Sequence, residues 1–242
     1  MKFKLYDIPP IIDYKHVQVV LGNEIGEGGG IKKPILDQVL ANIEADIIGY
    51  PADGKGSAGE ALALACKTVG KRLHLLLPEG ELPETETFRK SVQPDHVTYE
   101  TVAGVQRQAD LVPAAEAWAK KNSGFSMEIG CRIPEFNQGL QDYITAIWKH
   151  HNLKTDAEIW YAAGSGTLFQ AIKKALPEST LGIGSLGFSQ MDVGGHMVKS
   201  PFNATIPTHY KLPFSVNPDY DARIWPEVLK RASPGAVVIN YQ

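Results

Sequence analysis

Cysteine is scarce in this sequence, and long apolar runs are missing. The chain of 242 residues has two cysteines, Cys66 and Cys131. These are too few for a disulfide framework, and they lack the spacing of a zinc motif. Because no run of about 18 apolar residues occurs, we expect no membrane span. The N-terminus also lacks the apolar core of a secretory signal. Together these absences predict a protein of the reducing cytoplasm.

An excess of basic residues is also missing. Lysine and arginine total 24 against 27 aspartate and glutamate, giving a formal charge of −3. This balance argues against tight non-specific binding of nucleic acid, although it leaves room for a local basic face. No group of histidine, aspartate and glutamate has metal-ligand spacing, so we expect no metal. Apolar residues make up 43% of the chain, enough for a sizeable core.

Apolar runs of strand length alternate with segments of helical periodicity along most of the chain. This alternation is typical of βαβ units and predicts an α/β fold with mostly parallel sheets. Residues 185–217 are irregular and rich in glycine, proline and serine, as functional loops often are. The strands are expected at 17–21, 46–50, 73–77, 97–101, 125–129, 159–163, 181–183 and 236–240, and the helices at 33–43, 57–70, 84–92, 109–121, 138–151, 167–176 and 221–231.

The most informative stretch is Gly28-Gly29-Gly30-Ile31-Lys32-Lys33-Pro34. Its glycines allow a tight turn and a close approach of the backbone to another molecule. Its lysines stand at the start of a helix, where the helix dipole disfavours a cation. One interpretation is a pair of solvated lysines in a loop. The other is a buried amine that is kept neutral and nucleophilic, ready to form a Schiff base.

A second glycine-rich turn, 54–59, joins a strand to an alanine-rich helix. Ser57 is a good N-cap residue, and Glu60 three residues later completes a capping box. A well-capped helix explains these residues without a ligand. A hydrogen-bond donor for a cofactor is the alternative.

A third turn, Gly164-Ser165-Gly166-Thr167, follows a strand that ends in Tyr161-Ala162-Ala163. Backbone N–H groups at such a helix start form a favourable phosphate site, and small residues let the phosphate come close. The hydroxyls of Ser165 and Thr167 are additional donors. Any tight strand-to-helix turn has a similar appearance, so the motif alone is weak.

A fourth motif, Asn217-Pro218-Asp219-Tyr220-Asp221, precedes the last predicted helix. The simplest interpretation is a proline-containing turn in which an aspartate caps the 221–231 helix.

The four motifs together resemble the fold type II pyridoxal-phosphate enzymes, the tryptophan synthase β family. The resemblance is to the branch of aminocyclopropane-carboxylate deaminase and D-cysteine desulfhydrase. That branch reads Gly-Gly-Asn-Lys where this chain has Gly29-Gly30-Ile31-Lys32. It reads Asp-Pro-Val-Tyr-Glu where this chain has 217–221. The motifs follow the family's order over most of the chain.

The resemblance implies a role for each motif. Lys32, favoured over Lys33, corresponds to the lysine that holds pyridoxal 5'-phosphate as an internal aldimine. Ser57 replaces the asparagine that contacts the phenolic oxygen of the cofactor. Residues Gly164, Ser165, Gly166 and Thr167 correspond to the phosphate-binding loop. Tyr220 corresponds to a tyrosine against the substrate, and Asp221 to a glutamate that faces the pyridine nitrogen.

The resemblance predicts a lyase or deaminase that acts at the α carbon of a small amino acid. Gly56 stands where the deaminase has a serine that helps to open the cyclopropane ring, so deaminase activity on that substrate is not expected. The compact length suggests a second possibility, a decarboxylase or lyase that trims an amino acid on a modified, phage-type DNA base or nucleotide. A third is a cofactor-binding protein without turnover.

The family architecture implies two lobes, and the lack of a long apolar run implies no membrane partner. The larger, cofactor-binding lobe is expected to combine residues 1–34 with 126–242, and the smaller lobe to comprise 35–125. Members of the family are often homodimers, so a homodimer is the expected assembly.

Overall fold

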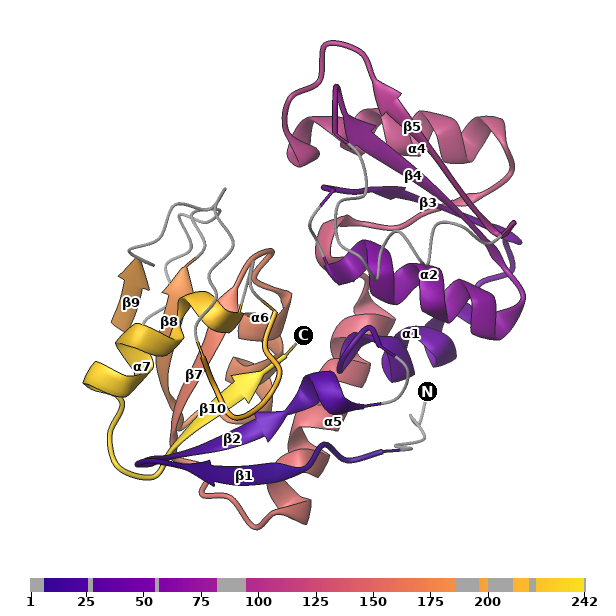
Figure 1. The fold of residues 1–242 in the computed structure, drawn as a ribbon. Helices are drawn as coiled ribbons and strands as arrows, with labels where there is room; N and C mark the ends of the chain where they lie inside the picture. The colour runs from indigo at the N-terminus through magenta and orange to yellow at the C-terminus, as the bar shows by residue number, and fades with distance from the viewer. Residues whose placement is uncertain are drawn as a thin grey trace. The chain divides into compact units, whose positions relative to one another are not determined.

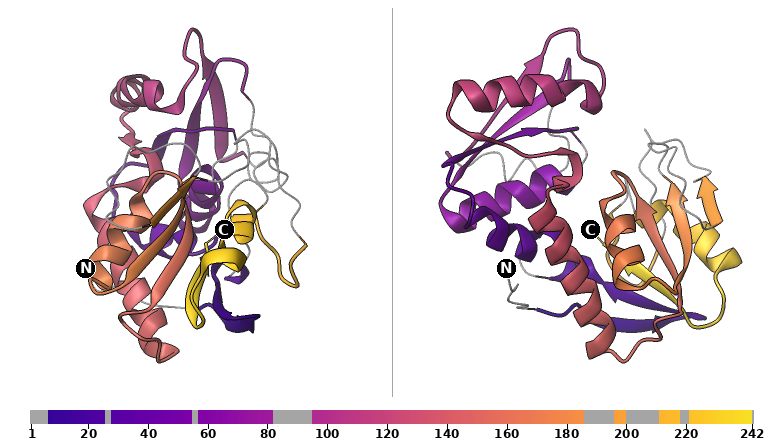
Figure 2. Two further views of the ribbon diagram at one scale, coloured as in Figure 1. Left: turned by 90° about the vertical axis from the view of Figure 1, so that its left-hand side faces the viewer. Right: turned by 180° about the vertical axis from the view of Figure 1, so that it is seen from behind.

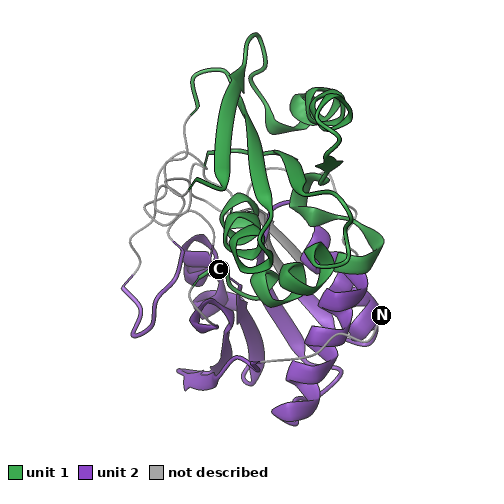
Figure 3. Cartoon of the chain, turned by 90° about the vertical axis from the view of Figure 1, so that its right-hand side faces the viewer, with its two compact units in different colours: residues 1, 27–136 green, residues 2–26, 137–242 purple. Residues whose placement is uncertain are grey.

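The computed structural model describes residues 7–25, 28–54, 57–81, 95–185, 196–199, 211–217 and 221–241. The chain divides into two compact units, which Figure 3 shows in different colours. Unit 1 contains residue 1 and residues 27–136, and unit 2 contains 2–26 and 137–242. The lobe boundaries predicted from the sequence, 1–34 plus 126–242 and 35–125, stay a prediction. Each unit has its own sheet (Figure 1).

Unit 1 is built on a four-stranded sheet in the order β5-β4-β3-β6. Its strands are β3 (Ile47–Pro51), β4 (Arg72–Pro78), β5 (Val97–Val102) and β6 (Phe125–Ser126), and all neighbours are parallel. The strand β4 is buried from Leu73 to Pro78, as expected for a parallel strand that is covered on both faces.

Helices cover both faces of this sheet. On one face, Trp118 of α4 (Val112–Lys121) stacks on His74 with ring centroids 4.2 Å apart. A Cβ atom added at Gly49 would lie 2.9 Å from Trp118, so α4 approaches β3 closely because residue 49 has no side chain. Next to β4 lies α2 (Ser57–Val69), which packs on α1 (Lys32–Leu40). The short helix η2 (Gln108–Leu111) precedes α4, and η3 (Ile129–Cys131) follows β6.

Unit 2 is built on a six-stranded sheet in the order β1-β2-β10-β7-β8-β9. The edge pair β1 (Ile11–Tyr14) and β2 (Val17–Leu21) is antiparallel, and every other neighbouring pair is parallel. The remaining strands are β7 (Glu158–Ala163), β8 (Thr180–Ser185), β9 (His196–Lys199) and β10 (Ala236–Asn240).

The two faces of this second sheet bury different sets of side chains. On one face, η4 (Asp221–Arg223) and α7 (Trp225–Arg231) enclose a core around Trp225, Trp160 and Val238. On the other face lie α6 (Thr167–Ala175) and α5 (Pro134–His150), seen from behind in Figure 2. The short helix η1 (Gly22–Glu24) follows β2. Both faces of the central strands are therefore covered.

The predicted α/β class with mostly parallel sheets is confirmed. Four details differ from the sequence-based expectation. The strand expected over 125–129 ends at Ser126, because Gly130 and Cys131 adopt positive φ in the turn of η3. The helix expected over 221–231 is broken into η4 and α7. The edge strand β1 was not predicted, and β9 lies within a stretch that was expected to be irregular.

The helix expected at 84–92 lies outside the described residues. In the part of the chain that the structure describes, no helix is long and apolar enough to cross a membrane.

Candidate active site

Lys32 is the first residue of α1 and is 8% exposed. Its Nζ donates a hydrogen bond to Oγ of Ser57, which is buried at the first position of α2. Two distant sequence motifs therefore meet within unit 1, because α1 packs on α2. Burial and the positive end of the helix dipole both disfavour the charged form of a lysine at this position.

The neighbouring lysine has a different environment. Nζ of Lys33 lies 2.8 Å from Oδ2 of Asp37, one turn further along α1. Both side chains of this pair are partly exposed. Lys33 is thus held in an i,i+4 ion pair on the helix surface, whereas Lys32 points to α2. The two lysines thus have different surroundings, and the choice of Lys32 over Lys33 stays a prediction.

The first turn of α2 also contacts the glycines that precede Lys32. The Glu60 carboxylate accepts a hydrogen bond from the backbone N–H of Gly29. A Cβ atom added at Gly29, whose φ is +76°, would lie 3.1 Å from Cα of Ala61. Glycine is thus required at residue 29 by both conformation and space. The sequence suggested a capping box between Ser57 and Glu60. In the structure, each of these side chains contacts the lysine segment.

The charge of Lys32 acts on two nearby side chains. Burial raises the pKa of Glu60, and the Gly29 hydrogen bond and the Lys32 charge oppose this rise without cancelling it. Burial raises the pKa of the Cys131 thiol to about 12, again opposed by Lys32. Cys131, fully buried, therefore lies near the lysine as a neutral thiol. The sequence allowed a thiol that lines the site, and equally a small buried residue.

The predicted phosphate loop lies in unit 2, between the carboxyl end of β7 and the start of α6. Gly166 has φ +81° and precedes the first helical residue, Thr167, which is 3% exposed. Oγ of Ser165 lies 3.0 Å from Oγ1 of Thr167. Ser165 is exposed and Gly164 partly buried. The strand, the tight turn and the helix occur as the sequence predicted, so a helix start with small residues is available for an anion.

The fourth motif is described only in part. Tyr220 lies outside the described residues, as do Lys55 and Gly56. Asp221 is 1% exposed in η4, which packs against β7 in unit 2. Arg223 of the same turn is equally buried. Asp221 thus belongs to the same unit as the phosphate loop, and it does not cap an α-helix as the simplest interpretation required.

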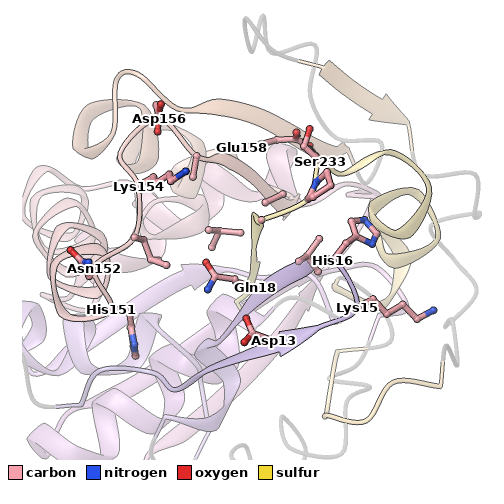
Figure 4. A pocket seen from close by; sticks show the side chains of 17 residues that line it. Asp13, Lys15, His16, Gln18, His151, Asn152, Lys154, Asp156, Glu158 and Ser233 are labelled. Atoms are coloured by element: carbon pink, nitrogen blue, oxygen red, sulfur yellow. Dashed lines mark hydrogen bonds between the residues drawn. The ribbon is translucent and has the colours of Figure 1, made fainter.

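A pocket of about 810 Å³ lies elsewhere in unit 2 (Figure 4). It is lined by residues at the amino ends of β2, β7 and β10, among them His16, Glu158 and Ala236. In open α/β sheets, ligands bind beyond the carboxyl ends of the strands. This pocket therefore lies at the amino ends of the strands, whereas the candidate phosphate loop lies at their carboxyl ends. None of the predicted site residues lines the pocket.

The predicted site residues thus form two groups. Lys32 and Ser57 contact each other in unit 1, while 164–167 and Asp221 lie in unit 2. Among the described residues, no three histidine, cysteine, aspartate or glutamate side chains are placed to hold a metal ion. Sequence reasoning missed the contact of Glu60 with the lysine segment. The available signal was its position one turn after Ser57, on the same face of α2.

Comparison with known proteins identifies the fold. No protein-family model matches the sequence, and no curated protein matches it. Among solved structures, an ACC deaminase homologue superposes with a TM-score of 0.74 at 14% identity, over 93% of this chain and 83% of that chain. A mutant of O-ureido-L-serine synthase with O-ureido-L-serine bound gives 0.67 at 14% identity, over 96% of this chain and 86% of that chain.

A third similar structure is diaminopropionate ammonia lyase from Escherichia coli, in complex with an aminoacrylate-PLP azomethine reaction intermediate. Its TM-score is 0.64 at 12% identity, over 98% of this chain and 84% of that one. Identities this low are informative about the fold, and the deaminase homologue represents the branch that the motifs resemble. The chain therefore has the fold of the fold type II pyridoxal-phosphate enzymes.

Proposed function

We propose that this protein is a pyridoxal-phosphate-dependent enzyme that acts at the α carbon of an amino-group substrate, as a lyase or deaminase. The observation that carries the proposal is the buried amine of Lys32, which contacts Ser57 at the start of α2. The fold supports it, since solved structures of the same architecture include an ammonia lyase in complex with an aminoacrylate-PLP azomethine reaction intermediate.

The residues present fit this cofactor. Lys32 offers a buried amine for a covalent bond, and Ser57 offers a hydroxyl beside that amine. Gly166 and Thr167 offer a helix start, with two hydroxyls 3.0 Å apart at Ser165 and Thr167. When bound, pyridoxal phosphate supplies the electron sink for bond cleavage at the α carbon. Lys32 would bind the cofactor and, once released, hold or deliver a proton at its Nζ.

The proposal assigns the remaining predicted residues in unit 2. Residues 164–167 would bind the phosphate through backbone N–H groups and hydroxyls. Asp221, as a buried carboxylate, would favour a protonated pyridine nitrogen, because opposite charges at short range stabilise one another. Tyr220 is proposed to contact the substrate.

The test is reconstitution of the purified chain with pyridoxal phosphate. Visible absorption should appear, and borohydride reduction followed by peptide mapping should place a phosphopyridoxyl group on Lys32. Lys32→Ala should lose the absorption, and the matched control Lys33→Ala should keep it, because the Lys33 amine is engaged with Asp37. A phosphopyridoxyl group on Lys33, or on neither lysine, would overturn the assignment.

The substrate class is tested on the same preparation. We expect the absorption to shift with a small free amino acid. A shift only with a nucleotide or DNA that carries an amino acid would favour the base-trimming alternative. Stable absorption that responds to neither would favour a cofactor-binding protein without turnover.

A further inference from the structure

The first turn of α2 contacts the lysine segment at three places. Ser57 accepts a hydrogen bond from Nζ of Lys32, and Glu60 accepts one from the N–H of Gly29. Ala61 lies directly against Gly29. Residues 57, 60 and 61 lie on one face of the helix because of their spacing. One turn of α2 therefore holds both the backbone before Lys32 and its side chain.

Opposing influences act on the Lys32 amine. Its burial and its position at the start of α1 favour the neutral form. The Glu60 carboxylate favours the protonated form, and the Lys32 charge in turn opposes the rise that burial causes in the pKa of Glu60. Among the described residues, the titratable groups beside this turn also include the neutral Cys131 thiol and the Lys33–Asp37 ion pair, in which the two charges compensate each other. Glu60 is a carboxylate whose charge counters the effect of burial at Lys32.

From this arrangement we infer that Glu60 is a positioning residue for Lys32, which holds the Gly28–Gly30 turn through the Gly29 N–H and stabilises the protonated amine. The inference deepens the proposed function and rests on Lys32 being its reactive lysine. Such a residue would let Lys32 hold a proton in spite of its burial. Glu60 would act through Lys32 and would not contact the reacting atoms itself.

Glu60→Gln separates the charge from the hydrogen bond, because the amide oxygen still accepts from Gly29. The measurement is competitive chemical labelling of lysines in the chain without cofactor, followed by peptide mass spectrometry across a pH series. The pH midpoint of Lys32 labelling should fall by about one unit in Glu60→Gln, since a close opposite charge has an effect of this order. Below the midpoint, Lys32 should therefore react about tenfold faster.

Two controls are available in unit 1, one lysine that is measured in the same samples and one matched variant. Lys33, read in each spectrum, should keep its midpoint, and Glu116→Gln, an exposed change on α4, should alter neither lysine. Glu60→Asp keeps the charge with a shorter reach, so its Lys32 midpoint should lie between those of the parent and Glu60→Gln. It serves as the readout if Glu60→Gln folds poorly.

Three outcomes would overturn the inference. These are an unchanged Lys32 midpoint in the Glu60 variants, a rise of that midpoint, or an equal shift at Lys33. Because no cofactor is present in the labelling, the result is independent of the proposed function. If pyridoxal phosphate failed to bind Lys32 while Glu60→Gln lowered its midpoint, the proposed function would fail and the Glu60–Lys32 relationship would stand.

Discussion

The amine of Lys32 donates a hydrogen bond to the hydroxyl of Ser57, and both side chains are buried. The two residues come from separate glycine-rich turns that the packing of α1 on α2 brings together. Each turn alone has an ordinary structural explanation in the sequence. Burying two polar side chains is costly unless they are hydrogen-bonded, and this pair makes that hydrogen bond. We therefore treat the two turns as parts of one candidate site.

The first prediction concerns this contact. Ser57→Ala should lower the free energy of unfolding by about 1–3 kcal/mol, because it leaves the buried Lys32 amine with one acceptor fewer. It should also lower the pH midpoint of Lys32 labelling, since the hydrogen bond favours the charged amine. Denaturant unfolding and the labelling series measure the two effects. Ser57→Thr keeps the hydroxyl and is the control. Parent-like values for Ser57→Ala in both assays would refute the role of the contact.

The second prediction concerns the pH dependence of stability at Glu60. Its pKa is raised in the folded chain, so between the unfolded and folded pKa values the native state binds more protons. The resulting stabilisation is present below the unfolded pKa and is lost as pH rises through the folded pKa. Relative to the parent, Glu60→Gln should therefore gain stability as pH rises from about 4 to neutrality. Melting temperatures across this range provide the measurement, with Glu116→Gln as control, and a parallel pair of curves would contradict the prediction.

The third prediction concerns Tyr161 of β7. Its hydroxyl is buried and has no hydrogen-bond partner among the described residues, and burial raises the pKa of this phenol. An unpaired buried hydroxyl costs about 1–3 kcal/mol. Tyr161→Phe should therefore raise the melting temperature by about 2–4 °C for each kcal/mol recovered in a chain of this size. A lower melting temperature, or weaker cofactor binding, would mean that the hydroxyl has a partner in solution.

The fourth prediction concerns the phosphate loop. Gly166→Ala forces a side chain into φ +81° at the start of α6 and should destabilise the chain by about 1–2 kcal/mol. It should also weaken binding of pyridoxal phosphate, because the turn presents the N–H groups. Ser165→Ala, at an exposed position, should weaken binding by about 0.5–1.5 kcal/mol, the contribution of one ordinary hydrogen bond. Spectrophotometric titration measures both, and parent-like binding by both variants would remove this loop as the phosphate site.

Much of the fold was predictable because the signals are local. The strand β4 and the helix α2 occupy almost the predicted residues. The misses have tertiary causes. β6 stops early because residues 130 and 131 turn back, and Gly130 donates its N–H to the Tyr50 hydroxyl 3.3 Å away. The helix expected over 221–231 breaks after Arg223, where α7 begins with Pro226 in its first turn.

The candidate site shows the same limit. Sequence spacing predicted a helix over 33–43 behind the glycines, and α1 begins one residue earlier, at Lys32. It could not show that Glu60 reaches Gly29, because that contact depends on how α2 packs on α1. A capping box and a contact with the lysine segment require the same residue types at the same spacing. Only the packing distinguishes them.

The last prediction concerns Asp221, a carboxylate that is 1% exposed in η4. If it faces the pyridine nitrogen, its charge favours the protonated ring, which withdraws electrons more strongly. Chemistry that builds up much negative charge at the α carbon would then be favoured, and simple dehydration of serine or threonine would be less favoured.

Asp221→Asn keeps the shape and removes the charge. It should retain bound pyridoxal phosphate, read from its visible absorption, and lose most turnover of the amino acid that shifts the absorption of the parent. Asp156→Asn, an exposed change in unit 2, is the control and should keep both properties. Because α7 begins at Trp225, a lost α-helix cap cannot explain an effect at residue 221. Normal turnover together with a lower melting temperature would assign Asp221 to the packing of η4 on β7 and would refute its role at the ring.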